Sequence, residues 1–146
     1  MMVLPRRRMM LAVGGAVLAG PARATEEQVA GLIAALVGGA KLTAGRVKLD
    51  LPQLVENGNA VSMTVSYEGP DDRTAGRVLS MHVFAGRNPL PNVTNVSFGP
   101  RSGRPRFATR IRLATSQTVV AIAKLEDGSC WSDSVELIVT LAACIE

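Results

Sequence analysis

The sequence is poor in the side chains from which most active sites are built. It has one histidine (His82), two cysteines, one tryptophan, one tyrosine and three phenylalanines. A single histidine excludes a two-histidine metal site and leaves no second imidazole to act as the base of a catalytic triad. No glycine-rich phosphate loop follows a predicted strand, and no serine lies in a nucleophile elbow. We therefore expect a protein that is not an enzyme and that needs no metal or cofactor.

Acidic residues are missing from the first 24 positions, and this changes the meaning of the net charge. The formal charge is +4, but Arg6, Arg7, Arg8 and Arg23 lie in residues 1–24, whereas all 12 acidic residues follow them. The rest of the chain is neutral. The basic composition is therefore a property of the first segment and does not favour a nucleic-acid partner.

Residues 1–24 have the three parts of an export signal. A charged start is followed by the apolar run Met9–Ala19 and by small residues at Ala22 and Ala24, where a signal peptidase cleaves. The run is too short and too rich in glycine for a permanent membrane-spanning helix. Arg7–Leu11 resembles the twin-arginine pattern, with an ordinary secretory signal as the alternative. Both predict removal of residues 1–24 and a periplasmic protein.

Helical spacing opens the predicted mature chain. Thr25–Gln28 reads as a capping box, because a threonine cap is followed three residues later by glutamine. Apolar residues then recur at helical spacing, and Gly38 and Gly39 end the run. One short amphipathic helix is predicted.

Seven short segments follow in which apolar and polar residues alternate, or in which β-formers predominate between turn signals. This pattern predicts an all-β, immunoglobulin-like antiparallel β-sandwich of about seven strands, in one domain over residues 25–141. The run Arg77–Ala85 is apolar on both faces and is expected to lie centrally or at a partner interface. Glu126–Gly128 is a hairpin turn signal. The segments are 47–51, 61–67, 77–85, 96–98, 107–113, 118–125 and 129–141.

His82 and the arginines each allow two interpretations. His82 is expected to be packed or hydrogen-bonded in its strand; the alternative is a copper site with Met81 and Met63, although alternation places Met81 and His82 on opposite faces. Five arginines without an intervening acid predict either a solvated surface or a docking patch for an acidic partner or anionic substrate. Arg101 and Arg104, in a glycine-flanked loop, are the docking candidates. The five are Arg101, Arg104, Arg106, Arg110 and Arg112.

The two cysteines are not expected to form a disulfide. If residues 129–141 form one strand, Cys130 and Cys144 lie about 45 Å apart, whereas a disulfide needs Cα atoms within about 7 Å. Cys130, beside Trp131, is predicted to be a small packing residue. Cys144 lies beyond the last strand on residues 142–146, where it is either a displayed thiol or an incidental cysteine.

Several blocks in collinear order resemble the SoxY family of thiosulfate-oxidation sulfur carriers. They are Arg46–Pro52, Glu56–Asn59, His82–Ala85 with Asn88-Pro89, Thr109–Ala114, and Asp127–Ser129 with Trp131. The resemblance implies a periplasmic β-sandwich that pairs with a SoxZ-type sandwich. It also implies a carboxy-terminal arm whose cysteine carries sulfur intermediates covalently, and Cys144 is the position that matches.

The arm departs from the family pattern Gly-Gly-Cys-Gly-Gly. Ala142 and Ala143 replace the first glycine pair, and Ile145 and Glu146 replace the second. This ending looks like a SoxY-related paralogous branch with an Ala-Ala-Cys-Ile-Glu arm. Alanine restricts the backbone, isoleucine adds bulk, and glutamate brings negative charge near the sulfur.

Two functions follow as expectations. The first is a carrier that is loaded with a sulfur species on Cys144 and presents it to partner sulfur-oxidation enzymes. The second is a periplasmic interaction module of the same fold whose altered arm has lost sulfur carriage. Either would pair with a SoxZ-like protein or with a second copy of the chain, through a surface that includes Arg77–Ala85.

Overall fold

The computed structural model of the protein describes residues 26–70 and 76–143. The predictions for residues 1–24, Thr25, Cys144, Ile145 and Glu146 lie outside the described residues. Within the described part, no helix is long and apolar enough to cross a membrane.

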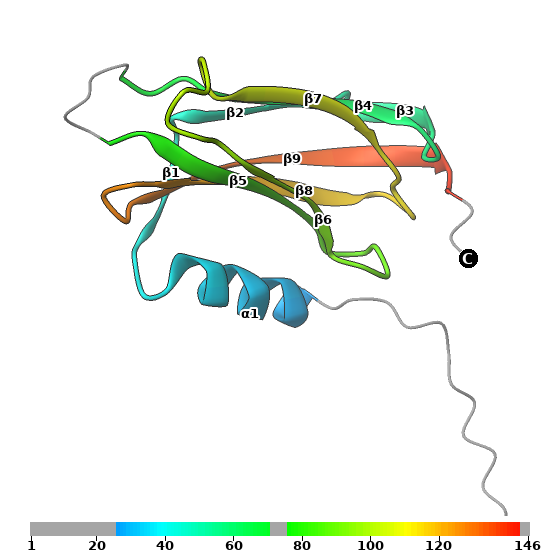
Figure 1. The fold of residues 1–146 in the computed structure, drawn as a ribbon. Helices are drawn as coiled ribbons and strands as arrows, with labels where there is room; N and C mark the ends of the chain where they lie inside the picture. The colour runs from blue at the N-terminus through cyan, green and yellow to red at the C-terminus, as the bar shows by residue number, and fades with distance from the viewer. Residues whose placement is uncertain (1–25, 71–75, 144–146) are drawn as a thin grey trace, which may run out of the picture.

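Two stacked sheets form the described part of the protein, with helix α1 against the outer face of the larger sheet (Figure 1). The larger sheet has the order β1-β9-β8-β5-β6, with β3 also paired to β9, and the smaller sheet has the order β2-β4-β7. This is the predicted sandwich. The elements are α1 (Glu26–Val37), β1 (Leu42–Ala44), β2 (Val47–Asp50), β3 (Leu54–Asn57), β4 (Val61–Tyr67), β5 (Val78–Ala85), β6 (Asn92–Ser97), β7 (Arg106–Ile111), β8 (Gln117–Leu125) and β9 (Cys130–Leu141).

Alternation along the strands builds the core between the sheets. In β4 every second residue is buried, beginning with Val61 and Met63, and these side chains face those of β5 and β8. Met63 and Met81, the latter from β5, are among the largest fully buried side chains. Burial of this apolar surface, at about 25 cal/mol per Å², is the main force that holds the two sheets together.

The doubly apolar strand β5 lies centrally, between β8 and β6. One face packs into the sandwich core, while Phe84 on the other face packs under α1 together with Ile122 and Cys130. The expectation that Arg77–Ala85 forms a partner surface is therefore corrected. Its apolar side chains, Leu79 apart, are already buried within the chain.

All seven predicted strands are present, and two more were missed. β1 and β3 are only three and four residues long, too short for alternation to identify them. Both pair in parallel with β9, through Leu42 opposite Cys130 and Leu54 opposite Ile138. The larger sheet is consequently mixed, whereas the pairs among the seven predicted strands are antiparallel.

The predicted hairpin turn at Glu126–Gly128 joins β8 and β9. Ser129 donates to the Asp127 carboxylate from its hydroxyl at 2.6 Å and from its backbone N–H at 2.8 Å. These hydrogen bonds to the charged form, that of the hydroxyl first, lower the pKa of Asp127 below its ordinary value. Gly128 has a φ of 88°, which glycine adopts without strain.

Truncation of Met63 tests the core. Met63→Ala removes a side chain that is 1% exposed between the sheets, so it should lower the free energy of unfolding by about 2–5 kcal/mol. Urea denaturation followed by circular dichroism measures this change. Ser62→Ala, on the exposed face of the same strand, should change stability by less than about 0.5 kcal/mol. Equal losses in the two variants would contradict the described alternation.

Candidate functional site at the end of β9

The last described residues lie at one end of the sandwich. β9 ends at Leu141 and is followed by Ala142 and Ala143. The β3–β4 turn, the β5–β6 loop, the β7–β8 loop and the start of α1 lie at the same end (Figure 1). We call Gly58, Leu113 and residues 141–143 the arm base.

Backbone hydrogen bonds join the three segments of the arm base. Gly58 N–H donates to the Leu141 carbonyl at 2.8 Å, and Leu113 N–H donates to the Gly58 carbonyl at 2.8 Å. Ala143 N–H in turn donates to the Leu113 carbonyl at 3.3 Å. The residue that precedes Cys144 is therefore attached to the sandwich.

Gly58 is the point where these segments approach most closely. A Cβ atom at this position would lie 2.3 Å from the Leu113 carbonyl oxygen, 3.0 Å from Ala143 N and 3.1 Å from Val139 Cγ1. Only glycine fits without a backbone shift. Sequence reasoning placed Gly58 in a block of resemblance but assigned it no role; the Asn57-Gly58 turn signal was the available clue.

Two buried amides hold the neighbouring loops in place. Asn88 is 7% exposed and Gln117 is 5% exposed. Asn88 Nδ2 donates to the Arg112 carbonyl at 2.8 Å, and its Oδ1 accepts from Ala114 N–H at 2.9 Å and from Gln117 Nε2 at 3.0 Å. Gln117 Oε1 accepts from Arg87 N–H at 2.9 Å. These hydrogen bonds join the β5–β6 loop to the β7–β8 loop at Arg112 and Ala114, the residues on either side of Leu113.

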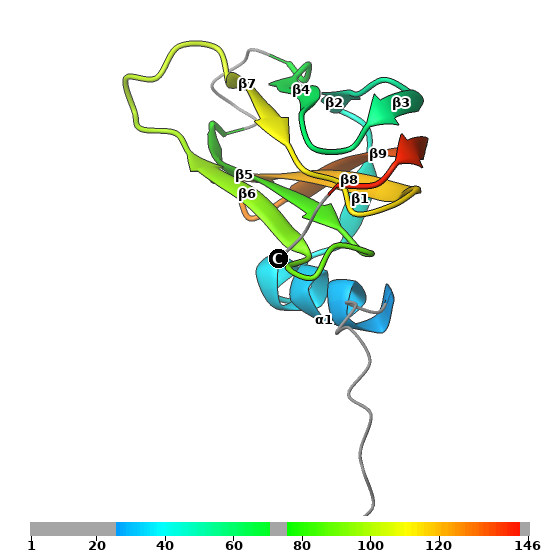
Figure 2. The ribbon, with the colours of Figure 1, turned by 90° about the vertical axis from the view of Figure 1, so that its right-hand side faces the viewer.

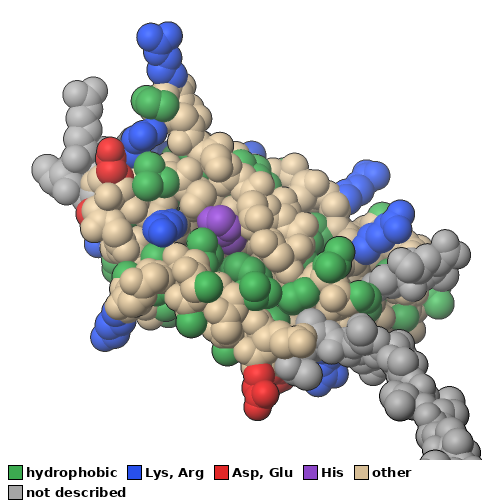
Figure 3. All heavy atoms as spheres, turned by 60° about the horizontal axis from the view of Figure 1, so that its bottom comes forward, with side chains coloured by type: hydrophobic (Ala, Val, Ile, Leu, Met, Phe, Trp, Pro, Cys, Tyr) green, Lys and Arg blue, Asp and Glu red, His purple; other side chains and the backbone are tan. Residues whose placement is uncertain are grey.

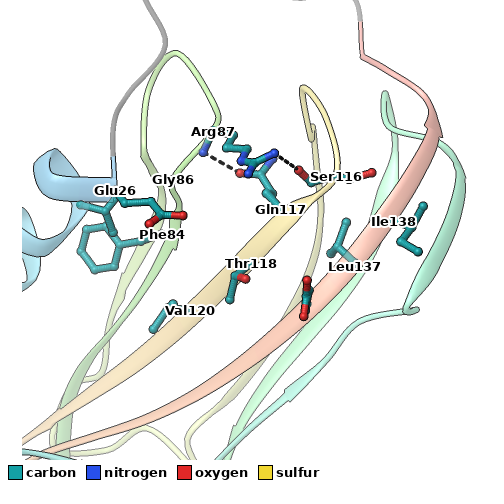
Figure 4. Close-up of a pocket in the computed structure, with 12 residues that line it drawn as sticks. Glu26, Phe84, Gly86, Arg87, Ser116, Gln117, Thr118, Val120, Leu137 and Ile138 are labelled. Atoms are coloured by element: carbon teal, nitrogen blue, oxygen red, sulfur yellow. Dashed lines mark hydrogen bonds between the residues drawn. The ribbon is translucent and has the colours of Figure 1, made fainter.

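Two hollows lie at this end of the sandwich. The first, of about 350 Å³, is on the α1 side of the larger sheet and is lined by both polar and apolar side chains (Figure 4). Its charged residues are Glu26, Arg87 and Glu136, and Arg87 Nη1 donates to the Ser116 carbonyl at 3.4 Å. The second, of about 330 Å³, lies between β6 and β7 and includes Arg110 and Arg112.

The structure separates four of the five arginines of the predicted cluster into two pairs, and the fifth, Arg106, begins β7. All five arginines are exposed. Arg110 and Arg112 line the second hollow, whereas Arg101 and Arg104 lie on the β6–β7 loop and line neither hollow. Both hollows were missed, because they depend on how loops distant in sequence pack.

His82 is hydrogen-bonded, as expected. Its Nδ1 lies 2.8 Å from Asn95 Oδ1, and its Nε2 lies 2.9 Å from Ser80 Oγ. Figure 3 shows the single histidine of the sequence, drawn in purple, on the surface of the protein. Met63 and Met81 are instead buried in the core between the sheets, so the three residues of the copper alternative are not brought together. The described residues contain no group of three or more His, Cys, Asp or Glu that could hold a metal ion.

Cys130 is a buried, free cysteine, and its predicted packing role is confirmed. It is 0% exposed and packs with Phe84 and Ile122 beneath α1. Burial raises the pKa of the Cys130 thiol, because removal from water disfavours the thiolate. The nucleophilic form is therefore suppressed at this position.

Comparison with known proteins identifies the class. The family model for the sulfur oxidation protein SoxY matches residues 33–144. The structure of the sulfur carrier protein SoxY from Chlorobium limicola f thiosulfatophilum is similar, with a TM-score of 0.65, 23% identity, and coverage of 79% of this chain and 98% of that chain. No curated protein sequence matches the chain.

Other solved structures share the fold alone. A superoxide reductase (neelaredoxin) from Ignicoccus hospitalis has a TM-score of 0.57 and 17% identity, and covers 80% of this chain and 94% of that chain. A putative superoxide reductase from Thermotoga maritima has a TM-score of 0.55 and 17% identity, with coverage of 68% and 93%. The sequence match decides between these neighbours: the chain belongs to the SoxY family, which comprises carrier proteins rather than enzymes.

Replacement of Gly58 tests the arm base. Gly58→Ala forces the Leu113 carbonyl and Ala143 N–H apart, and should lower the free energy of unfolding by about 2 kcal/mol or more. Amide hydrogen exchange should accelerate at Leu113 and Ala143. Gly103→Ala is the matched control, because a Cβ there meets no atom within 4 Å. Unchanged exchange at Ala143 in Gly58→Ala would contradict the role of Gly58.

Alkylation tests the burial of Cys130. In a Cys144→Ser background, iodoacetamide at pH 8 should leave Cys130 unmodified in the native protein and modify it in urea, as measured by intact mass. Burial raises the pKa of the Cys130 thiol in the folded state. The protonated thiol therefore contributes stability below the ordinary thiol pKa, and this contribution is lost as the pH rises above the ordinary thiol pKa. Equal modification rates in native buffer and in urea would refute the burial.

Proposed function

We propose that this chain is a periplasmic sulfur carrier that holds a sulfur intermediate covalently on Cys144 and presents it to sulfur-oxidation enzymes. The observation that carries the proposal is the SoxY family match, which extends to residue 144 and so includes Cys144. Export by the twin-arginine route, with removal of residues 1–24, belongs to the same proposal.

The chemistry requires little from the carrier itself. A thiolate forms and breaks S–S bonds by exchange, and needs exposure more than a neighbouring acid or base. Loading with thiosulfate joins Cys144 Sγ to the outer sulfur of thiosulfate; it releases the thiol proton and two electrons, which an oxidising partner enzyme accepts. The scarcity of catalytic residues in the described part agrees with this division of labour.

The arm base limits how the cysteine is presented. Ala143 N–H donates to the Leu113 carbonyl, so the described chain is attached to the sandwich as far as Ala143, the residue before Cys144. One peptide separates Cys144 from Ala143, and successive Cα atoms are about 3.8 Å apart, so the attachment at Ala143 keeps the point of sulfur loading near the sandwich. We propose that this chain serves partners that approach close to the sandwich.

Partner recognition is assigned to surfaces outside the core. Arg101 and Arg104 are exposed on the β6–β7 loop, and they are the proposed docking patch for an acidic partner enzyme. A SoxZ-like sandwich is the proposed structural partner, with a second copy of this chain as the alternative.

One observation favours the second candidate, a non-carrier interaction module. Ala142 and Ala143 have less backbone freedom than a glycine pair, and Ala143 N–H is bonded to the Leu113 carbonyl, so the chain is restricted just before Cys144. Such a module would keep its partner binding when the thiol is removed.

Intact mass spectrometry separates the two candidates. After incubation with thiosulfate and an oxidising partner, the wild-type protein should gain the mass of one thiosulfate adduct on the tail peptide, whereas Cys144→Ser should gain none. Cys130→Ala is the matched control and should load as the wild type does, because Cys130 is buried. A tail that stays unmodified under every loading condition would overturn the carrier and leave the module.

A further inference from the structure

The second hollow lies between two edge strands. β6 is the last strand of the larger sheet and β7 is the last strand of the smaller sheet. Figure 2 shows the two strands along the same side of the sandwich, joined by the loop between them. Edge strands present backbone groups that no neighbouring strand pairs, so this side offers hydrogen-bonding capacity besides its side chains.

The charge of the second hollow is positive. Arg110 and Arg112 line it, together with neutral polar residues that include Asn92, Thr94 and Thr109. None of the described residues that line it is acidic. Both arginines are exposed, and within residues 26–70 and 76–143 the structure shows no ion pair for either. Their guanidinium groups are available to a ligand.

The first hollow provides the contrast. It has nearly the same size, but its charged residues are Glu26, Arg87 and Glu136, and Arg87 already donates to the Ser116 carbonyl. An anion is repelled there and attracted in the second hollow. The two hollows have nearly the same volume, so their charge decides which of them favours an anion.

The second hollow adjoins the arm base. Arg112 lines it, and the next residue, Leu113, carries the carbonyl that accepts the Ala143 N–H at 3.3 Å. The Asn88 amide donates a hydrogen bond to the Arg112 carbonyl at 2.8 Å, and this bond joins the edge of the hollow at Arg112 to the β5–β6 loop. A residue that lines the hollow is therefore directly bonded to the residue that holds Ala143, the position before Cys144.

We propose that the second hollow is a binding site for a small sulfur oxyanion, held by Arg110 and Arg112. Guanidinium groups bind sulfonate-type oxygens through paired charge-assisted hydrogen bonds, and a hollow of about 330 Å³ accommodates such an ion. This inference rests on the proposed function: the site would hold the charged end of the species that Cys144 carries. It adds non-covalent recognition of thiosulfate by the carrier itself.

The experiment uses the full chain with Cys144→Ser, which removes covalent loading. Thiosulfate and sulfate are titrated and followed by ¹H–¹⁵N NMR, with chloride at equal ionic strength as reference. We expect saturable shifts at residues 109–112. Arg110→Ala with Arg112→Ala should raise the Kd about tenfold or more. Lys41→Ala with Lys48→Ala, which removes two exposed cations that line neither hollow, should change it less than about twofold.

Three results would overturn the site: shifts that do not saturate, shifts that chloride reproduces, or an equal loss of affinity in the arginine and lysine double variants. The third would show that overall charge, rather than the hollow, attracts the ion. The two arginines and the two lysines are all exposed, so the urea transition should be the same in every variant, and this is checked first. An adduct on wild-type Cys144 without saturable binding removes the site and keeps the carrier; saturable binding without an adduct does the reverse.

Discussion

The position of strand β9 is the constraint on which the rest of the structure depends. β9 pairs with β8 along one edge and with the short strands β1 and β3 along the other. A strand of 12 residues held on both sides cannot shift its register without exposing the side chains that it buries. Its buried residues take part in two cores, since Leu137 packs between the sheets and Cys130 packs under α1. The carboxy-terminal end of β9, at Leu141, therefore has a defined position in the sandwich.

At the carboxy-terminal end of β9, the neighbouring segments are joined to one another by backbone hydrogen bonds. The Gly58 turn, Leu113 and Ala143 are joined through main-chain N–H and carbonyl groups, and the close approach depends on the missing Cβ of Gly58. The buried amides of Asn88 and Gln117 support the same loops, and the nitrogen and oxygen of each amide take part in at least one hydrogen bond. These contacts make the end of the described chain, as far as Ala143, part of the sandwich.

The fold was largely predictable, whereas the site was not. Alternation in segments such as Val61–Tyr67 identified seven strands, because burial on one side of a strand imposes a period of two. β1 and β3 have no such period, since each is a short parallel addition to β9. His82 and Cys130 were interpreted correctly as structural residues from their local sequence alone. Gly58, the Asn88–Gln117 pair and the two hollows were missed, because each depends on contacts between segments that are distant in the sequence; Asn88 and Gln117, for example, are 29 positions apart.

By itself, the sequence determined which segments alternate between apolar and polar residues, and that the excess positive charge lies in residues 1–24. It also determined that a cysteine follows the last predicted strand and that few catalytic side chains are present elsewhere. These are local properties of composition and spacing. The tertiary structure decided that Ala143 is attached to Leu113, that Arg110 and Arg112 share a hollow which Arg101 and Arg104 do not line, and that Cys130 is buried beneath the helix. The physical reason is that contacts between distant segments form only when the sheets stack, and no local pattern encodes the distance between two loops.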